Sequence, residues 1–185
     1  MKKNHNFIAL IPARSGSVGI KNKNIVKFQN KMLIEHTLIA AQKSKYIKEK
    51  YISTNSKKYI SLLENYKNFI FLKRPQKYSL NSSRAREVVS HFIDEYRKNN
   101  SIINKNIIYL QPTSPFRNYK DIDSAIELYL KTKAKSLISV KEISKKFLKI
   151  FSIHKNKLKI LNDKNYSNYN RQSLPKVFHP NGAIY

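Results

Sequence analysis

Short β-rich segments alternate with helical segments along the first 140 residues, and this alternation limits the fold more than any other feature. The β-rich segments are Phe7–Ile11, Tyr51–Thr54, Phe69–Leu72, Ile107–Leu110 and Leu137–Val140. Strands that alternate with helices pair in parallel through right-handed crossovers. The sequence therefore predicts an α/β fold in which a mostly parallel sheet is flanked by helices.

Apolar residues recur at helical spacing between these β-rich segments. The expected helix faces are Ile34, Leu38 and Ala41; then Val89, Phe92, Ile93 and Tyr96; then Ile122, Ala125, Ile126 and Tyr129. Spacing near 3.6 residues is typical of helices that bury one side. We interpret these aromatic and aliphatic side chains as core residues rather than cofactor contacts.

The pattern changes after Val140. Phe147–Ile153 and Lys157–Leu161 flank His154-Lys155-Asn156, which predicts a small β-hairpin. Residues 162–172 are polar and predict a loop, and residues 174–185 run into a further expected strand. The length suits one domain over residues 1–185, with the hairpin as an excursion.

Charge and composition restrict the class of protein. The 37 Lys and Arg residues against 11 Asp and Glu residues give a formal net charge of +26, but the lysines are scattered through nearly every segment. This favours a solvated basic surface, so nucleic acid is an unlikely partner, although a basic nucleic-acid-binding domain stays open as an alternative.

The absence of cysteine excludes disulfides and thiol catalysis. Because no segment resembles a signal peptide or a membrane span, we expect a cytoplasmic protein with no membrane partner.

The histidines show no paired spacing suited to a metal, and no acidic cluster accompanies them. We predict that each of the five is structural or exposed: His5, His36, His91, His154 and His179.

Two of the three glycines, Gly16 and Gly19, lie close together after the first β-rich segment. They are mixed with hydroxyl and cationic side chains, among them Arg14, Ser17 and Lys23. Amides, hydroxyls and cations in a tight turn after a strand can bind phosphate. From spacing alone, phosphate binding and a plain glycine turn with solvated lysines both remain open.

Polar sequences follow three of the expected strands. They are the Arg14 loop, Lys73-Arg74-Pro75 and the segment from Gln111 to Arg117. In an open parallel sheet the ligand lies at the carboxyl ends of the strands, so we expect these loops to converge. Such cations and amides, with few carboxylates, suit phosphoryl or nucleotidyl transfer. Asp121 and Asp123 are interpreted as helix-capping residues instead.

Four motifs occur in a characteristic order: Ile11-Pro-Ala-Arg-Ser-Gly-Ser-Val-Gly-Ile-Lys-Asn-Lys-Asn24, Arg74-Pro75, Leu110-Gln-Pro-Thr-Ser-Pro-Phe-Arg117 and Arg171-Gln-Ser-Leu-Pro-Lys-Val-Phe-His-Pro-Asn-Gly-Ala-Ile-Tyr185. Together they resemble the acylneuraminate cytidylyltransferases, or CMP-sialic acid synthetases, with relatives that act on legionaminic and pseudaminic acids. The resemblance implies a Rossmann-like nucleotidyltransferase. It also implies a Mg²⁺-dependent reaction in which CTP and a nine-carbon keto-sugar acid give the CMP-sugar and pyrophosphate.

The resemblance assigns roles to individual residues. Arg14 and Gln111 would act at the reaction centre. Residues that would hold CTP are Gly16, Ser17, Gly19, Lys21, Lys23, Asn24, Arg74 and Ser82. Residues that would line the sugar site are Gln111, Lys149, Arg171, Asn181 and Tyr185, with Arg171 paired to the sugar carboxylate. A homodimer is expected through the hairpin and loop of residues 141–170.

The chain departs from the family pattern at several positions. Val18 stands where the phosphate loop usually has lysine, and Asn55 and Asn81 stand where the family has aspartates. The family also continues beyond the position of Tyr185 into a segment with Mg²⁺-binding aspartates, so we interpret residues 1–185 as a domain truncated at its carboxyl end. A catalytically impaired homologue that binds nucleotide or sugar therefore stays open as an alternative.

Overall fold

The computed structural model describes residues 6–102, 105–162 and 166–185, and contacts divide the chain into two compact units. The first unit comprises residues 1–137 and 182–185, and the second comprises residues 138–181. The single domain expected over residues 1–185 thus has two parts, and the hairpin and loop of residues 141–170 belong to the second. His5 and residues 163–165 of the expected loop lie outside the described residues.

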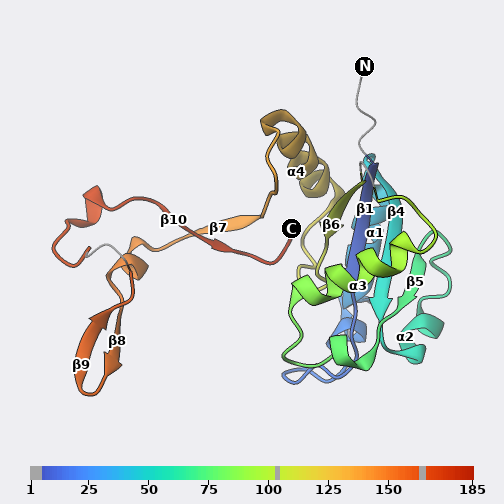
Figure 1. Ribbon diagram of the computed structural model, residues 1–185, viewed down its shortest axis with the longest axis horizontal. Coiled ribbons are helices and arrows are strands. Elements are labelled where there is room, and N and C mark those ends of the chain that lie inside the picture. The colour runs from blue at the N-terminus through green and yellow to red at the C-terminus, as the bar shows by residue number, and fades with distance from the viewer. Residues whose placement is uncertain (1–5, 103–104, 163–165) are drawn as a thin grey trace. The chain divides into compact units, whose positions relative to one another are not determined.

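A four-stranded parallel sheet forms the centre of the first unit (Figure 1). Its strands are β1 (Asn6–Pro12), β4 (Ile47–Thr54), β5 (Ile70–Lys73) and β6 (Lys105–Tyr109), in the order β5-β4-β1-β6. All three pairings are parallel, and Leu10 of β1 lies opposite Tyr51 of β4 and Tyr109 of β6. The predicted α/β fold with a parallel sheet is confirmed for these four strands.

Helices follow the strands, as the apolar spacing predicts. They are α1 (Leu33–Lys43), α2 (Lys57–Leu62), α3 (Ala85–Arg97) and α4 (Tyr119–Thr132). The short α2 had no counterpart in the sequence analysis, and neither did the two-residue strands β2 (Lys27–Phe28) and β3 (Lys31–Met32). Two 3-10 turns, η1 (Lys23–Ile25) and η2 (Gln76–Tyr78), lie in the loops after β1 and β5.

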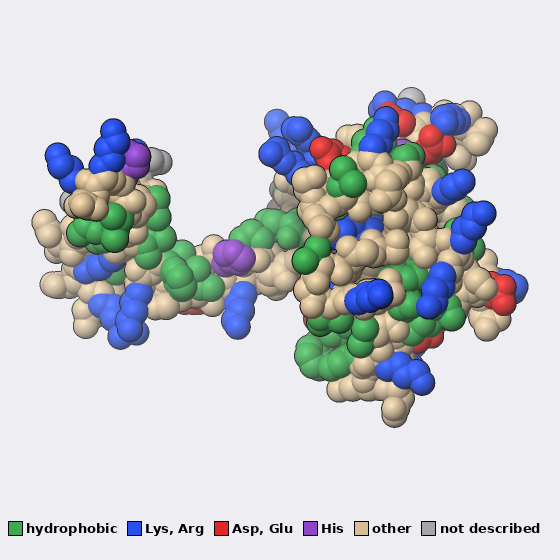
Figure 2. All heavy atoms as spheres, turned by 90° about the horizontal axis from the view of Figure 1, so that it is seen from below, with side chains coloured by type: hydrophobic (Ala, Val, Ile, Leu, Met, Phe, Trp, Pro, Cys, Tyr) green, Lys and Arg blue, Asp and Glu red, His purple; other side chains and the backbone are tan. Residues whose placement is uncertain are grey.

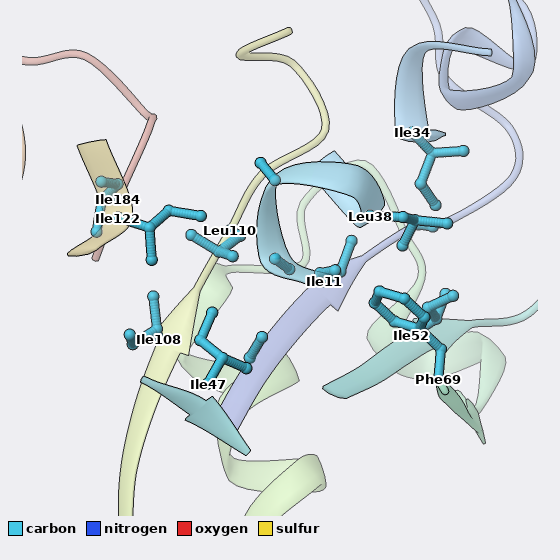
Figure 3. Close-up of a cluster of buried hydrophobic side chains, with 14 of the residues drawn as sticks. Ile11, Ile34, Leu38, Ile47, Ile52, Phe69, Ile108, Leu110, Ile122 and Ile184 are labelled. Atoms are coloured by element: carbon cyan, nitrogen blue, oxygen red, sulfur yellow. The ribbon is translucent and has the colours of Figure 1, made fainter. Parts of the chain in front are cut away.

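Alternate side chains of β1 supply the core on both faces of the sheet. Ile8 and Leu10 pack with Phe92 and other residues of α3, whereas Ile11 packs with residues of α1 and α4. Figure 3 shows part of the cluster around Ile11, which includes Leu110, directly after β6, and Ile122 of α4. Each fully buried aliphatic side chain contributes about 1.5–3 kcal/mol, so this two-sided core makes the sheet a firm support for its loops.

The prediction that Leu137–Val140 adds another strand to this sheet is wrong. The strand in that region, β7 (Val140–Ile143), pairs antiparallel with β10 (Val177–Pro180) in the second unit. The edge of β6 at Tyr109 is occupied by Tyr185 instead. The Tyr109 amide donates to the Tyr185 carbonyl at 2.9 Å, and the Tyr185 amide donates back at 3.3 Å.

The second unit contains the predicted hairpin. It is formed by β8 (Phe151–His154) and β9 (Lys157–Ile160), joined by Lys155 and Asn156, which both have positive φ. Two consecutive residues with positive φ are typical of the type I′ turn that matches strand twist. The first arm is shorter than predicted because Lys145–Lys149 forms the 3-10 helix η3; a further one, η4, spans Arg171–Ser173.

The two aspartates interpreted as helix caps have different roles. Asp121 accepts a hydrogen bond from the amide of Asn118, the N-cap residue of α4, at 2.8 Å, so it does cap the helix. The interpretation of Asp123 as a helix-capping residue is wrong. It is buried and accepts hydrogen bonds from the Ser44 hydroxyl and the Lys45 amide, which joins α4 to the end of α1.

Lysine and arginine side chains are spread over the visible faces of both units in Figure 2, rather than gathered in one patch. Within the described ranges, no helix combines the length and apolar character that a membrane crossing requires.

Candidate functional site

A pocket of about 600 Å³ lies at the carboxyl ends of the strands of the first unit. The residues that line it come from the loops after β1, β5 and β6 and from α3: Pro12, Arg14, Ser17, Val18, Gly19, Ile20, Lys23, Asn24, Arg74, Tyr78, Asn81, Ser83, Val88, Tyr109, Gln111, Pro112 and Thr113. The three loops expected to converge therefore do so. The volume lies in the usual range for small-molecule sites.

The loop after β1 folds around one glycine that the backbone requires. Gly16 has a φ of 78°, which a residue with a side chain adopts only with strain. Gly19 has no such φ, and a side chain there would meet nothing within 4 Å. The Asn24 amide holds the turn by donating to the Arg14 carbonyl at 3.0 Å. The loop thus presents Arg14, Ser17 and Lys23 to the pocket.

Two asparagines connect this loop to its neighbours. Arg14 Nη1 donates to Asn81 Oδ1 at 2.8 Å. The Ser15 amide donates to Asn55 Oδ1 at 2.9 Å, and Asn55 Nδ2 donates to Gln76 Oε1 at 3.2 Å. Because Asn55 follows β4, and Gln76 and Asn81 follow β5, the hydrogen bonds join the ends of three strands.

Arg74 is the most unusual side chain of the pocket. It is only 3% exposed, and its Nε and Nη2 have no hydrogen-bond partner within the described part of the chain. Burial, with a smaller contribution from the charge of Arg14, lowers the pKa of Arg74 to about 10, so the guanidinium remains protonated at neutral pH. A buried cation with unpaired donors costs free energy that a bound ligand can offset.

Tyr109 and Val88 form an apolar wall beside this guanidinium, since both are buried and both line the pocket. Burial raises the pKa of Tyr109 to about 12, so its hydroxyl stays neutral and can donate a hydrogen bond. Tyr78 also lines the pocket and is half-buried. These three residues were not predicted from the sequence, because aromatic and β-branched side chains are usually core residues. The position of Tyr109, just before the Gln111 motif, is the one signal that pointed to it.

Gln111 lies in the pocket as expected, and Arg117 of the same motif holds it there. Buried Arg117 donates from Nη1 to the carbonyls of Gln111 at 3.1 Å and Ala183 at 2.6 Å. Gly182 has a φ of 76°, and a side chain there would meet Gln111 Oε1 at 3.3 Å. Arg117 is therefore a structural residue that joins two of the sequence motifs.

Several predicted site residues lie elsewhere. Lys21 and Ser82 are exposed and do not line the pocket, although Ser83 does. Tyr185 lines a separate apolar cavity of about 330 Å³ along β6.

The remaining predicted sugar-site residues belong to the second unit. Arg171 is exposed and lines a cavity of about 550 Å³ with Glu142, Ser144 and Lys145. Lys149 Nζ donates to the carbonyls of Ser167 and Tyr169. Asn181 Oδ1 accepts from the Ser139 hydroxyl at 2.6 Å.

The described residues do not fit a magnesium ion. No group of three or more His, Cys, Asp or Glu side chains among them is arranged to hold a metal, and the residues that line the main pocket include no carboxylate. Magnesium prefers carboxylate and phosphate oxygens. The expected Mg²⁺ therefore finds no carboxylate among the residues that line this pocket.

Sequence comparison places the chain among known proteins. The sequence model of the family described as "Cytidylyltransferase" matches residues 8–182. The N-acylneuraminate cytidylyltransferase of Escherichia coli O18:K1:H7 is 35% identical over 180 residues, which cover 97% of this chain and 41% of that protein. The CMP-N,N'-diacetyllegionaminic acid synthase of Legionella pneumophila is 32% identical over 140 residues, 76% of this chain and 60% of that protein. The chain thus spans about two fifths of the length of the Escherichia coli protein.

Solved structures show the same fold. A CMP:2-keto-3-deoxy-manno-octonic acid synthetase complexed with CTP superposes with a TM-score of 0.60 at 16% identity, over 77% of this chain and 55% of that one. A 4-diphosphocytidyl-2C-methyl-D-erythritol synthase superposes with a TM-score of 0.65 at 12% identity, over 98% of this chain and 75% of that one. The predicted Rossmann-like nucleotidyltransferase fold is confirmed.

Proposed function

Because the chain belongs to the cytidylyltransferase family, we propose that its first unit binds CTP in the 600 Å³ pocket. We further propose that the protein transfers CMP to a nine-carbon keto-sugar acid and releases pyrophosphate. The observation that carries the proposal is the set of cations Arg14, Lys23 and Arg74, which line one pocket whose lining includes no carboxylate. Nucleotidyl transfer depends mainly on positioning and on neutralising phosphate charge, which such a set supplies.

The triphosphate is assigned to the loop after β1. Arg14 and Lys23 would face the phosphates, and Ser17 and the loop amides would complete the contacts. Val18 is 77% exposed and supplies no charge in this loop. Arg14 and Lys23 therefore carry more of the phosphate recognition than they would if position 18 also held a cation.

The cytosine base is assigned to the deeper part of the pocket. Arg74 has two donors to satisfy, and cytosine carries a carbonyl oxygen and a ring nitrogen acceptor side by side. A planar guanidinium suits such a pair of acceptors. Tyr78 and Val88 would contact the faces of the ring.

The anomeric hydroxyl of the sugar attacks the α-phosphorus, a bond forms between this oxygen and the phosphorus, and the hydroxyl proton is released to water. The bond from this phosphorus to the bridging oxygen breaks, and pyrophosphate leaves. Gln111, held by Arg117, lies in the pocket where the sugar would approach.

Arg171 of the second unit is assigned to the carboxylate of the sugar acid. Arg171 is exposed and presents a planar donor suited to a carboxylate. This assignment rests on the family resemblance and on the accessibility of Arg171.

A homodimer is proposed from the hairpin of the second unit. Phe151 faces Ile160 and Ile153 faces Leu158 across β8 and β9, so alternation places these four apolar side chains on one face. Ile153 is 77% exposed and Leu158 is 71% exposed. A second copy of the chain that covers this face would remove apolar surface from water.

Two measurements test the function. Calorimetry should show CTP binding, with ATP at least about tenfold weaker because adenine, unlike cytosine, has no two adjacent acceptors for the donors of Arg74. Incubation with CTP, Mg²⁺ and a panel of nine-carbon keto-sugar acids should release pyrophosphate. CTP binding without release from any sugar would favour the impaired homologue, and no CTP binding would contradict the assignment of the pocket. The scattered charge in Figure 2 argues against the nucleic-acid alternative.

A further inference from the structure

Two asparagines hold two consecutive residues of the loop after β1. Asn81 accepts from the Arg14 side chain at 2.8 Å, and Asn55 accepts from the Ser15 amide at 2.9 Å and from the Ser15 hydroxyl at 3.3 Å. These contacts join residues that are 67 and 40 positions apart in the sequence. The Asn81 side chain therefore orients the guanidinium of Arg14, and the Asn55 side chain holds the backbone of Ser15 beside it.

The contacts fix the orientation of the Asn55 amide. The Ser15 backbone N–H is always a donor, so it must meet Oδ1 of Asn55 rather than Nδ2. Asn55 Nδ2 then donates to Gln76 Oε1 at 3.2 Å. Asn55 thus uses both ends of its amide to connect the loop after β1 with the segment after β5.

Both partners of Arg14 are neutral. Arg14 Nη1 donates to the Gly16 carbonyl and to the Asn81 amide oxygen, and none of the ion pairs among the described residues involves Arg14. An amide orients a guanidinium without cancelling its charge, whereas a carboxylate at the same distance would form an ion pair. The full charge of Arg14 therefore remains available to a ligand in the pocket.

We propose that Asn55 and Asn81 are positioning residues for the phosphates of the nucleotide. Asn81 aims Arg14 at the pocket, Asn55 holds the adjacent Ser15 backbone, and both keep the pocket rim free of negative charge. This inference rests on the proposed binding of CTP and extends it to two residues that do not themselves need to touch the ligand.

The charge requirement is tested with Asn81→Asp, using CTP, inorganic tripolyphosphate and cytidine as probes. The new carboxylate pairs with Arg14, so CTP and tripolyphosphate should bind about tenfold more weakly at low salt. Cytidine carries no phosphate and should bind as it does to the wild-type protein. Asn65→Asp is the matched control, because Asn65 is exposed and does not line the pocket. It should leave all three affinities unchanged.

The positioning role is tested with Asn81→Ala in two backgrounds. In the wild-type background tripolyphosphate binding should weaken about fivefold, because Arg14 loses its direction. In the Arg14→Ala background the same change should have no further effect, since Asn81 acts through Arg14. Asn55→Ala should also weaken tripolyphosphate binding, and thermal unfolding of each variant shows whether the fold is retained.

The outcomes separate the two claims. If the wild-type protein binds neither CTP nor tripolyphosphate, the proposed function fails, and this inference falls with it. If the wild-type protein binds both, and the folded Asn81 variants bind them equally well, the inference alone is overturned. Equal losses from Asn81→Ala with and without Arg14 would also overturn it.

Discussion

The two units of this protein differ in how they bury their apolar side chains. The first unit has core clusters on both faces of its sheet, with Ile8, Leu10 and Ile11 fully buried. In the second unit, Leu174 is the one buried side chain among the described residues, while Ile153 and Leu158 are largely exposed. The first unit can therefore stabilise itself, whereas the second leaves apolar surface for another molecule to cover.

The same difference separates the parts of the proposed site. The nucleotide pocket rests on strands with a core beneath them and includes the buried Arg74. In the second unit Arg171 is exposed.

The largest expected effect compares one leucine from each unit. Leu10→Ala should lower the free energy of unfolding by about 2–5 kcal/mol, because Leu10 is fully buried between the sheet and α3. Leu158→Ala should lower it by less than about 0.5 kcal/mol in dilute protein, because that side chain is already in water. Denaturant unfolding of both variants measures the change in the free energy of unfolding. Similar losses in the two variants would contradict the expected difference between the units.

The next effect separates the nucleotide from the sugar. Arg14→Ala should weaken CTP binding by about 10- to 100-fold, since it removes a charged donor from the phosphate loop. Arg171→Ala should leave CTP affinity unchanged but weaken binding of the sugar acid. Calorimetry with each ligand gives both values, and Arg97→Ala, an exposed arginine of α3 away from the pocket, is the control. A loss of CTP affinity in Arg171→Ala would show that the division of roles is wrong.

A smaller effect concerns the hairpin. The double variant Ile153→Lys and Leu158→Lys should raise the dissociation constant of the proposed dimer by about tenfold or more, because two apolar contacts are replaced by like charges. The unfolding of the first unit should not change. Sedimentation velocity over a dilution series reports the association, and His154→Lys, on the opposite polar face of β8, serves as the charge control.

The smallest effect is the alkaline stability of the first unit. Burial, together with a hydrogen bond to Glu35, raises the pKa of Tyr66 to about 12. The folded protein therefore keeps the Tyr66 proton between pH 10 and 12, where the unfolded chain loses it. Stability present below pH 10 is lost as the pH rises through this window.

Tyr66→Phe should reduce that loss by about 1 kcal/mol or less, because the side chain is half-buried and solvent screens its interaction with Glu35. Urea unfolding at several alkaline pH values measures the slope. An identical pH dependence in the variant and the wild-type protein would assign the loss to other groups.

The sequence predicted the elements whose spacing repeats. Four strands and three helices were found because apolar periodicity marks them directly, and their parallel order brought the three loops together as expected. The prediction that Leu137–Val140 forms a strand of this sheet failed. Apolar periodicity does not show which of two segments pairs with the edge strand β6. Tyr185 occupies that edge beside Tyr109, although the two residues are far apart in the sequence.

The sequence predicted those site residues whose type already indicates their chemical role. Arg14, Lys23 and Arg74 were found because cations near glycine and proline at strand ends are uncommon in a core. Tyr109 and Val88 were missed because they look like core residues, and they are buried like them. The contacts of Asn55 and Asn81 were missed for another reason: they join residues from separate loops, and only the folded chain shows which amide meets which partner.

Residues 182–185 return to β6, and this return affects how the sequence of such a protein can evolve. Residues 182–185 belong to the first unit, so the second unit is inserted between two stretches that are both anchored there. Arg117 and the pairing of Tyr109 with Tyr185 secure the second anchor. An insertion held at both ends can be lengthened, shortened or exchanged while the nucleotide unit keeps its register. Descendants of one ancestor can in this way keep the same nucleotide pocket and diverge in the inserted unit.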